Sequence, residues 1–391
     1  MAISGGPDIV EDGLVLHLDA AEPLCFRGEP TTNLASYTNG NASRGSWPYG
    51  VYTHSIETTG EFAGWEKIVA TSVGSATSNY IVHIGQFFPT SGVQYTGSIE
   101  FYSPYNNLMF EITGGQGIGS ATRIGSSNKY YRTFATSIST NMAWYLRTIA
   151  STPANTAITN GVIYYRRAQF EQKPYYTDFT IGTRGSTVAT GGGLLDLTNN
   201  GNNGEINRTS VPSAAFYSGN NRGSFVFNGS NDYISTGKVL VPRTGEFHIE
   251  GWCYLNQTNV ISMFVTQYFN SGDSGRFQCF FFSDGSIRMH DGIGVMTGNT
   301  PTYLANEWFY VAFQRDSNNF CNIFVNGIKA TTGDTKTSTL ENTNTIIGSR
   351  GSNTDNTFYN GKMAHVRIYN RALTQEQILQ NYHATKGRFG L

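Results

Sequence analysis

The 391-residue chain carries charge at only 14% of its positions and has a formal net charge of −1. Such a balance provides no field that would attract nucleic acid or an anionic membrane, and no cluster of Lys and Arg changes this locally. Aromatic residues make up another 14% of the chain, and 45 residues are glycine. This composition favours sheets over helices, and the length allows two or three domains of about 150 residues each.

The first residues, MAISGGPDIVEDG, lack the basic and apolar segments of a secretory signal. No apolar run approaches the roughly 20 residues that would cross a bilayer, so no membrane insertion is expected. None of the four cysteines stands in a C-x-x-C pair, and three of them lie in strand-like runs. We therefore expect a reducing compartment and buried free thiols at Cys25, Cys253, Cys279 and Cys321.

Residues 13–20, GLVLHLDA, alternate three leucines with Val15, His17 and Asp19. The leucine face predicts a strand packed against a core. The residues before it are polar and contain Gly and Pro. We expect residues 1–12 to form an N-terminal arm that becomes ordered on another subunit.

From residue 31 to about residue 182, short apolar runs alternate with Gly-, Ser- and Asn-rich segments. A block of this size is large enough to be a domain by itself, and regular short strands with polar turns predict an all-β sandwich. A turn-rich stretch with one short strand at residues 194–197 follows. The strands expected in the block are residues 80–84, 95–102, 108–112, 130–136, 142–149 and 161–170.

The sequence GSFVFNGSNDYIS, residues 223–235, predicts a strand, a hairpin-type turn at Asn228–Gly229 and a second strand. Phe225 and Phe227 fall on one face of the first strand. The same pattern of strand, turn and strand continues downstream, with two more Asx–Gly turns. Further strands are expected at residues 247–255, 277–282, 286–290, 307–314, 321–325 and 361–370.

One helix closes the chain. Thr374 and Gln377 form a capping box at its start, Ile378 and Tyr382 contribute to its apolar face, and Gly387 lies just past its end. The helix is short, so we expect it to cover a sheet edge or an open end of a sandwich.

The second half of the chain resembles the laminin-G-like, concanavalin A-like jelly roll. The resemblance rests on segments in a family-specific order: SFVFNGSNDYI, FHIEGWCYL, EWFYVAF, IFVNGIK and GKMAHVRIYNRALTQEQI. The opening GLVLHLDAA resembles the first strand of the same module, and DLTNNGNNGEI at residues 196–206 resembles the piece that normally follows it. TTNL at residues 31–34 and AQFEQKPYYTDF at residues 168–179 resemble the two ends of a carbohydrate-binding-module type of sandwich.

This pattern implies an all-β fold of two β-sandwich (jelly-roll) domains, one inserted into the other. The host domain would comprise residues 13–27 and 183–391, and the insert residues 28–182. The combination resembles virion proteins of tailed bacteriophages, cyanophages among them. It implies assembly in host cytoplasm, capsid or tail proteins as partners, and a homo-oligomer.

Catalytic signatures are missing from the sequence. Concanavalin-like glycosidases place two carboxylates on one strand face in an E-x-D-x-E pattern, but no E-x-D occurs here. We interpret Glu250 as a polar sheet residue and GDSG at residues 272–275 as a turn rather than a protease loop. His17, His248 and His365 alternate with apolar strand residues, so we expect outward or hydrogen-bonded positions. The sequence therefore predicts a protein that is not an enzyme.

Two kinds of ligand remain open from the sequence. Both resembled families often hold Ca²⁺, and oxygen ligands would come from Asp19, Asp196, Asn199 and Asp232 if the split module closes; Asx-turns explain these residues equally well. A sugar would use aromatic platforms. The candidates are Trp47, Tyr49, Trp65, Tyr131 and Trp144, with a core position as the alternative, above all for Trp65 and Trp144.

The sequence thus predicts a non-catalytic phage virion protein, as head decoration, fibre, spike or tail component, with glycan or host-surface contact through one sandwich. The alternative is a dedicated receptor-binding adhesin of the tail. A glycan depolymerase is a third reading, which the missing carboxylate pair disfavours.

Overall fold

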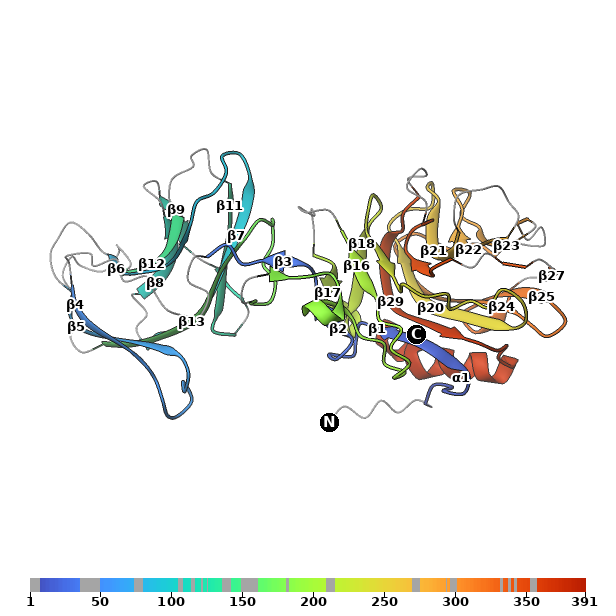
Figure 1. Cartoon of the computed structure of the whole chain (residues 1–391), viewed down its shortest axis with the longest axis horizontal. Coiled ribbons are helices and arrows are strands. Elements are labelled where there is room, and N and C mark those ends of the chain that lie inside the picture. Colours follow the sequence, from blue (N-terminus) through green and yellow to red (C-terminus); the bar gives the residue numbers. More distant parts are fainter. Residues whose placement is uncertain are drawn as a thin grey trace. The chain divides into compact units, whose positions relative to one another are not determined.

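Figure 1 shows the protein as a computed structural model. The chain divides into two compact units: unit 1 comprises Met1–Pro30, Gly185–Ser210 and Ala215–Leu391, and unit 2 comprises Thr31–Arg184 with Val211–Ala214. Within the described residues both are almost entirely β-structure, and the predicted all-β class with one short C-terminal helix is confirmed. The structure describes all residues except 1–7, 36–49, 74–79, 105–107, 114–116, 121, 125, 136–141, 149–160, 181–182, 209–214, 269–274, 293, 296–300, 331–332, 337–338, 341–342 and 352–356.

Unit 1 contains two large antiparallel sheets. The nine-stranded sheet runs in the order β17 (Tyr217–Ser218), β18 (Ser224–Asn228), β29 (Asn360–Tyr369), β20 (Phe247–Leu255), β24 (Trp308–Arg315), β25 (Phe320–Val325) and β26 (Ile328–Lys329). In addition, β1 (Leu14–Asp19) pairs with β29, and β27 (Asp334–Thr335) pairs with β25. The six-stranded sheet runs β16 (Glu205–Asn207), β19 (Tyr233–Ser235), β28 (Ile346–Ile347), β21 (Ser262–Gln267), β22 (Arg276–Phe281) and β23 (Ile287–Gly292).

Smaller elements complete unit 1. A separate two-stranded pair joins β2 (Phe26–Gly28) to β15 (Gly193–Leu194). The α-helix is α1 (Gln375–Thr385), and three short 3-10 helices are η1 (Val188–Thr190), η2 (Asn220–Arg222) and η3 (Lys386–Phe389).

Strand alternation gives the nine-stranded sheet two buried faces. In β24, Phe309, Val311 and Phe313 enter the main core, which the six-stranded sheet also lines. Tyr310 and Ala312 enter a second cluster on the opposite, outer face. The strand expected at residues 307–314 is present as β24, and the outer face of the sheet is covered rather than solvated.

All four cysteines are buried free thiols, as predicted. Three of them lie in β20, β22 and β25, where each takes a core position. Burial raises the pKa of the Cys25 thiol to about 12. Such thiols are protonated at neutral pH and are unsuited to metal ligation.

The opening strand lies beside the end of the chain. In β1, His17 is the register partner of Arg367 and Leu18 that of Val366, both in β29. The loop after β15 also binds β1, because the Leu197 amide donates to the His17 carbonyl at 3.0 Å. A register shift after Leu14 puts this leucine against the second cluster, so the predicted three-leucine face is only partly correct.

The segment Gly223–Ser235 does form two strands, but they do not pair with each other. Strand β18 pairs with β17 and β29 in the nine-stranded sheet, whereas β19 pairs with β16 and β28 in the other sheet. The side-chain oxygen of Asn228 accepts from the amides of Ser230, Asn231 and Asp232, and so holds the chain as it crosses over. The hairpin interpretation of this Asn–Gly turn was therefore wrong, whereas Asn326–Gly327, with φ of 50° and 79°, does connect paired strands.

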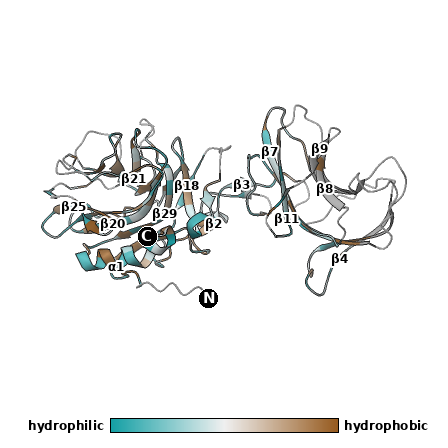
Figure 2. Ribbon diagram, turned by 180° about the vertical axis from the view of Figure 1, so that it is seen from behind, coloured by the Kyte–Doolittle hydropathy of each residue, from teal (hydrophilic) through white to brown (hydrophobic). Residues whose placement is uncertain are grey.

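Helix α1 forms where the capping box predicts it. Thr374 Oγ1 accepts from the Gln377 amide at 3.3 Å, and Gln377 Oε1 accepts from the Thr374 amide at 3.1 Å. Figure 2 shows hydrophilic and hydrophobic turns alternating along it. Its buried side, with Ile378, packs on the second cluster, so it covers a sheet face and not the predicted edge or open end.

Unit 2 contains a six-stranded and a four-stranded antiparallel sheet. The first runs β10 (Thr122–Arg123), β11 (Lys129–Ala135), β7 (Gln94–Tyr102), β13 (Gly161–Glu171), β5 (Glu66–Val73) and β4 (Gly50–Ile56). The second runs β6 (Tyr80–Phe87), β12 (Met142–Thr148), β8 (Leu108–Thr113) and β9 (Gly117–Ser120). All six strands expected here are present; β4, β5, β9 and β10 were missed.

The two ends of unit 2 lie side by side. Strand β3 (Thr31–Thr32) pairs with β14 (Thr183–Arg184). Nearby, Glu171 is buried and accepts from the hydroxyls of Thr31 and Thr177, both at 2.7 Å. The motifs TTNL and AQFEQKPYYTDF thus supply the hydrogen bonds that join the two ends of unit 2.

Candidate functional site

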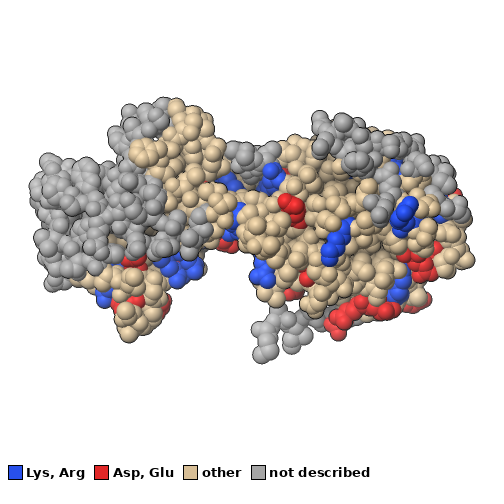
Figure 3. All heavy atoms as spheres, viewed as in Figure 1, with Lys and Arg blue, Asp and Glu red and all other residues tan. Residues whose placement is uncertain are grey.

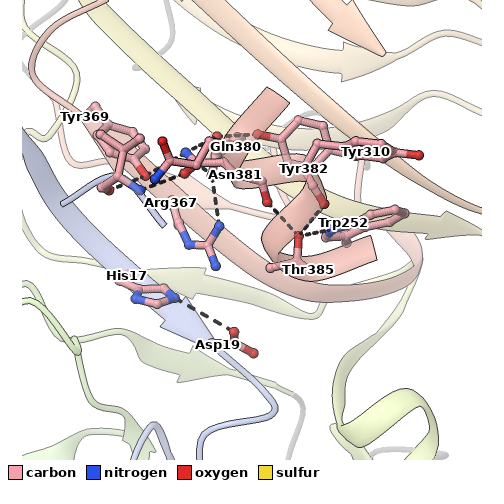
Figure 4. A network of polar contacts seen from close by, with 12 residues as sticks. His17, Asp19, Trp252, Tyr310, Arg367, Tyr369, Gln380, Asn381, Tyr382 and Thr385 are labelled. Carbon is pink, nitrogen blue, oxygen red and sulfur yellow. Dashed lines mark hydrogen bonds and ion pairs between the residues drawn. The ribbon is translucent and has the colours of Figure 1, made fainter. Parts of the chain in front are cut away.

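A buried polar network lies on the outer face of the nine-stranded sheet, beneath α1. Its centre is Glu250 of β20, which is 0% exposed. Arg367 Nη1 of β29 donates to Glu250 Oε1 at 3.0 Å, and Asn381 Nδ2 of α1 donates to both carboxylate oxygens at 3.1 and 3.0 Å. The Tyr310 hydroxyl of β24 also donates to this carboxylate. Figure 4 shows Arg367 and Tyr369 from the sheet beside Asn381 from the helix.

His248 completes the surroundings of Glu250. Its Nε2 lies 3.0 Å from Glu250 Oε2, and its Nδ1 lies 2.9 Å from Gln314 Oε1. The Leu373 amide donates to the same Gln314 oxygen at 2.8 Å, which fixes that atom as an acceptor. Burial opposes ionisation of Glu250, but the His248 hydrogen bond and the Arg367 charge outweigh it and hold the pKa of Glu250 below its ordinary value.

Two further histidines border the network. Both ring nitrogens of His365 are buried without a hydrogen-bond partner among the described residues. Burial, and then the charge of Arg367, lower the pKa of His365 well below its usual value, so the ring stays neutral. The pKa of His17 is lowered by the same two causes. The histidines lie on the outer face as expected, but that face is buried.

Aromatic contacts lock α1 and η3 over this face. The Trp252 indole donates from Nε1 to Thr385 Oγ1 at 2.7 Å, and Figure 4 shows this bond. The Trp252 ring stacks on Tyr382 and Phe389, with centroids 5.7 and 4.2 Å away. Close to the start of the described chain, the Val10 amide donates to Asn381 Oδ1 at 2.8 Å. Val10 is buried, so the part of the expected free arm around it is bound within its own chain.

The network is unsuited to hydrolysis of a sugar. Glycoside hydrolysis uses two carboxylates on either side of the scissile bond, one of which gives a proton. Within the described residues, the hydrogen-bond partners of Glu250 are Arg367, Asn381, Tyr310 and His248, and none of them is a carboxylate. Its lowered pKa and complete burial suit a structural anion. Residues 272–274 of the GDSG segment lie outside the described residues.

Two of the predicted calcium ligands, Asp19 and Asp232, accept hydrogen bonds from donors of the protein itself. Asp19 Oδ1 accepts from Arg388 Nη1 and from the Ala21 amide, both at 2.8 Å. Asp232 accepts from Arg208 through Nε at 3.0 Å and Nη2 at 3.1 Å. Guanidinium groups at these positions compete with a bound cation.

Asp196 and Asn199 shape the loop that closes on β1. Asp196 accepts from the amides of His17 and Thr198, both at 3.1 Å, and of Asn202 at 3.0 Å. Asn199 is exposed and has a φ of 64°. Among the described residues no group of three His, Cys, Asp or Glu side chains is placed to hold a metal ion.

Of the predicted sugar platforms, the structure describes the side chains of Trp65 and Tyr131. Trp47 and Tyr49 lie outside the described residues, and of Trp144 the structure describes only its place in β12, opposite Ile84 and Ile112. Trp65 is 6% exposed, and the Arg166 guanidinium lies 4.2 Å from its ring centroid. Tyr131 of β11 is half-buried, with Tyr176 at a centroid distance of 4.9 Å.

The structure brings together three aromatic residues that the sequence interpretation missed. We call Phe62, Tyr102 and Tyr164 the aromatic patch. Phe62 stacks on Tyr164 at 4.4 Å with an interplanar angle of 12° and meets Tyr102 at 4.7 Å. Tyr102 is a register partner of Tyr164 on neighbouring strands, β7 and β13. Their outward position in period-two strands was the available signal; Phe62, in a turn, had none.

Charged pairs flank the aromatic patch. Arg166 Nε and Arg167 Nη1 donate to the two oxygens of Glu100 at 2.7 and 3.0 Å. Burial opposes ionisation of Glu100, but these two hydrogen bonds keep its pKa below the ordinary value. On the other side, Lys67 Nζ donates to Glu57 Oε2 at 2.8 Å and is the main cause that lowers the pKa of Glu57 to about 2.

A comparison with known families matches part of unit 1. Residues 228–379 match the family model described as the Concanavalin A-like lectin/glucanases superfamily. Unit 1 therefore carries a concanavalin A-like domain. No curated protein matches the sequence significantly. Among the described residues no helix is both long and apolar enough to span a membrane.

Several solved structures are similar to part of this chain. Domain 4 of an extracellular GH43 arabinanase from Geobacillus stearothermophilus, solved with arabinotriose, matches at 18% identity and a TM-score of 0.39, covering 48% of this chain and 91% of that chain. The binding domain of Paraclostridial mosquitocidal protein 1 matches at 18% identity and a TM-score of 0.36, covering 48% and 49%. The receptor-binding domain of botulinum neurotoxin type G matches at 16% identity and a TM-score of 0.36, covering 48% and 48%.

Proposed function

We propose that the protein is a non-catalytic, glycan-binding component of a tailed-phage virion. It would serve as head decoration, fibre, spike or tail component and make weak contact with host-surface glycans. We further propose that it assembles as a homo-oligomer with capsid or tail proteins. A dedicated receptor-binding adhesin of the tail is the second candidate.

The observation that carries the binding role is the state of Glu250. The superfamily of unit 1 includes lectins and glucanases, and a glucanase needs an accessible acid as well as a second carboxylate. Glu250 is the acidic residue at the middle of the sheet, and it is buried, ionised and held by Arg367, His248 and Asn381. This supports the lectin branch over the glucanase branch.

The virion setting rests on the resemblance of the whole domain combination to phage virion proteins. The buried thiols and low charge are compatible with assembly in a host cytoplasm. Electron microscopy of particles labelled with an antibody to this chain tests the setting. Label at one defined station on the particle supports the proposal, and particles that carry none of the chain contradict it.

Binding, adhesion and cleavage are separated by one set of measurements on the full-length chain. We expect retention on a printed glycan array and no release of reducing sugar from host envelope. Release of sugar would replace the proposal with a depolymerase. Blocking of phage adsorption by the purified chain would favour the dedicated adhesin.

A further inference from the structure

We infer that the aromatic patch of unit 2 is the sugar-contacting site, with Tyr102 and Phe62 as platforms and Arg166, Arg167 and Glu100 as polar contacts. The inference rests on the glycan-binding part of the proposed function and adds its location. It assigns the contact to residues in β7, β13 and the β4–β5 connection.

The patch is accessible at one end and supported at the other. Tyr102 is 37% exposed at the end of β7. Phe62 and Tyr164 are half-buried, and Trp65 beneath Arg166 is buried. A ring that is packed on its back and open on its front loses little conformational freedom when a ligand stacks on it.

The turn that carries Phe62 is held in place before any ligand arrives. The Glu57 amide donates to the Trp65 carbonyl at 2.9 Å, and the Gly64 amide donates to the Glu57 carbonyl at 2.7 Å. Glu57 Oε1 also accepts from the amides of Thr58 and Thr59 at 3.0 and 3.3 Å. These bonds close the turn between β4 and β5 from which the Phe62 side chain projects.

The flanking charges match a sugar better than an apolar partner. A pyranose presents a C–H face that stacks on an aromatic ring, and hydroxyls around its rim that both donate and accept. Glu100 provides acceptor oxygens next to the donors of Arg166 and Arg167, whose side chains are 35% and 47% exposed. Figure 3 shows acidic and basic side chains interspersed on the described surface of this unit. An interface with an apolar protein surface would leave these charges desolvated.

The experiment compares four forms of the full-length chain on a printed array of neutral and uronic-acid oligosaccharides. They are the wild type, Tyr102→Ala, Tyr102→Phe and Phe88→Ala. Phe88 is the matched control because it is a 73% exposed aromatic residue of the same unit outside the patch. We expect Tyr102→Ala to weaken the retained ligands by about tenfold or more. Tyr102→Phe and Phe88→Ala should bind like the wild type.

The outcomes separate the site from the function. A wild type that retains no array ligand contradicts the glycan-binding function, and the site falls with it. Retention that survives Tyr102→Ala overturns the site and leaves the function standing. If the patch instead contacts another protein chain, Tyr102→Ala changes the sedimentation of the pure protein but not its array binding, which also overturns the site. Phe62→Ala repeats the test from the turn, independently of any local effect on β7.

Discussion

Each of the two units has a carboxylate, a guanidinium and an aromatic ring close together on a sheet. These side chains are buried in unit 1 and partly exposed in unit 2. In unit 1, Glu250, Arg367 and Trp252 lie under α1 and are 0 to 1% exposed. In unit 2, Glu100, Arg166 and Tyr102 also lie on neighbouring strands, and no helix covers them among the described residues. A carboxylate, a guanidinium and an aromatic ring in adjacent strands therefore do not by themselves mark a binding site. What covers them decides whether they hold the fold together or contact a ligand.

The difference has an energetic side. A buried ion pair has lost its hydration, so each partner depends on the other, whereas a half-exposed pair is screened by solvent and contributes little. Substitutions in the network should therefore affect stability, and substitutions in the patch should affect binding. Each prediction below breaks or sharpens this contrast.

The largest effect is expected from Glu250→Gln. The change leaves Arg367 buried without its counter-charge, and removing one partner of a buried pair costs about 3–5 kcal/mol. Urea denaturation, with hydrogen–deuterium exchange in β20, β29 and α1 to assign the transition to unit 1, measures it. Glu22→Gln is the control, because Glu22 is exposed and its hydrogen bonds to described residues are made by its main-chain amide and carbonyl, not by its carboxylate. A loss below about 1 kcal/mol for Glu250→Gln would mean that the network is not a structural ion cluster.

A smaller effect is expected from Asn381→Leu, which removes the link between α1, Glu250 and the Val10 amide. Loss of hydrogen bonds to a charged group costs about 1.5–3 kcal/mol. Exchange of the Val10 amide should speed up, because its acceptor is gone. The control is His383→Ala, an exposed position on the same helix. Unchanged exchange at Val10 would show that the N-terminal segment is held by packing alone.

Acid should weaken unit 1 in a pH range that leaves the charged pairs of the patch intact. His365 stays neutral in the folded protein, whereas the unfolded chain takes up a proton below its ordinary pKa of 6.5. Stability therefore falls as pH drops below about 6.5, by at most about 1.4 kcal/mol per pH unit for each such histidine. Glu250 and Glu57 have lowered pKa values, so the stability that they contribute is lost only below their ordinary pKa of 4.5.

Urea denaturation at pH 7.5 and pH 5.5 tests this assignment. The transition of unit 1 should move to lower urea at pH 5.5, and His365→Gln should reduce the shift. The comparison uses the difference between the two pH values, so that a general loss of stability in the variant cancels. An equal pH shift in wild type and variant would place the titrating group elsewhere.

The strands could be predicted well from the sequence because the alternation of apolar and polar residues with period two is a local pattern. Residues 247–255 were predicted as a strand and form β20 with the same bounds. The sheet partners of β18 and β19 could not be predicted from the sequence. An Asn–Gly turn gives the same signal whether the next strand pairs with the previous one or crosses to another sheet. The buried polar network could not be predicted for a related reason. His248, Glu250 and Trp252 lie on one face of β20, and the local sequence does not show that α1, more than 100 residues later, covers this face.

The sites followed the same rule. Trp65 was named as a candidate sugar platform but is buried in the structure, whereas Tyr102, which is exposed, was not singled out. Exposure depends on which turn folds over which strand, and the turn at Phe62 gives no periodic signal. Glu171 shows the opposite case. It lies in a segment that was noted for its resemblance to a family of binding modules, and its hydrogen bonds hold the two ends of unit 2 together.

The smallest effect on stability is expected from Tyr102→Ala, the variant with the largest expected effect on binding. Tyr102 is the most open ring of the patch, and its contact with Phe62 is one aromatic pair, so the free energy of unfolding should change by less than about 1 kcal/mol. Trp65→Ala, at a buried position on the same face, should cost about 3–5 kcal/mol. The thermal midpoint of unit 2 in both variants measures the difference. Equal losses would mean that Tyr102 is part of the core, and any lost glycan binding would then reflect unfolding and not the removal of a platform.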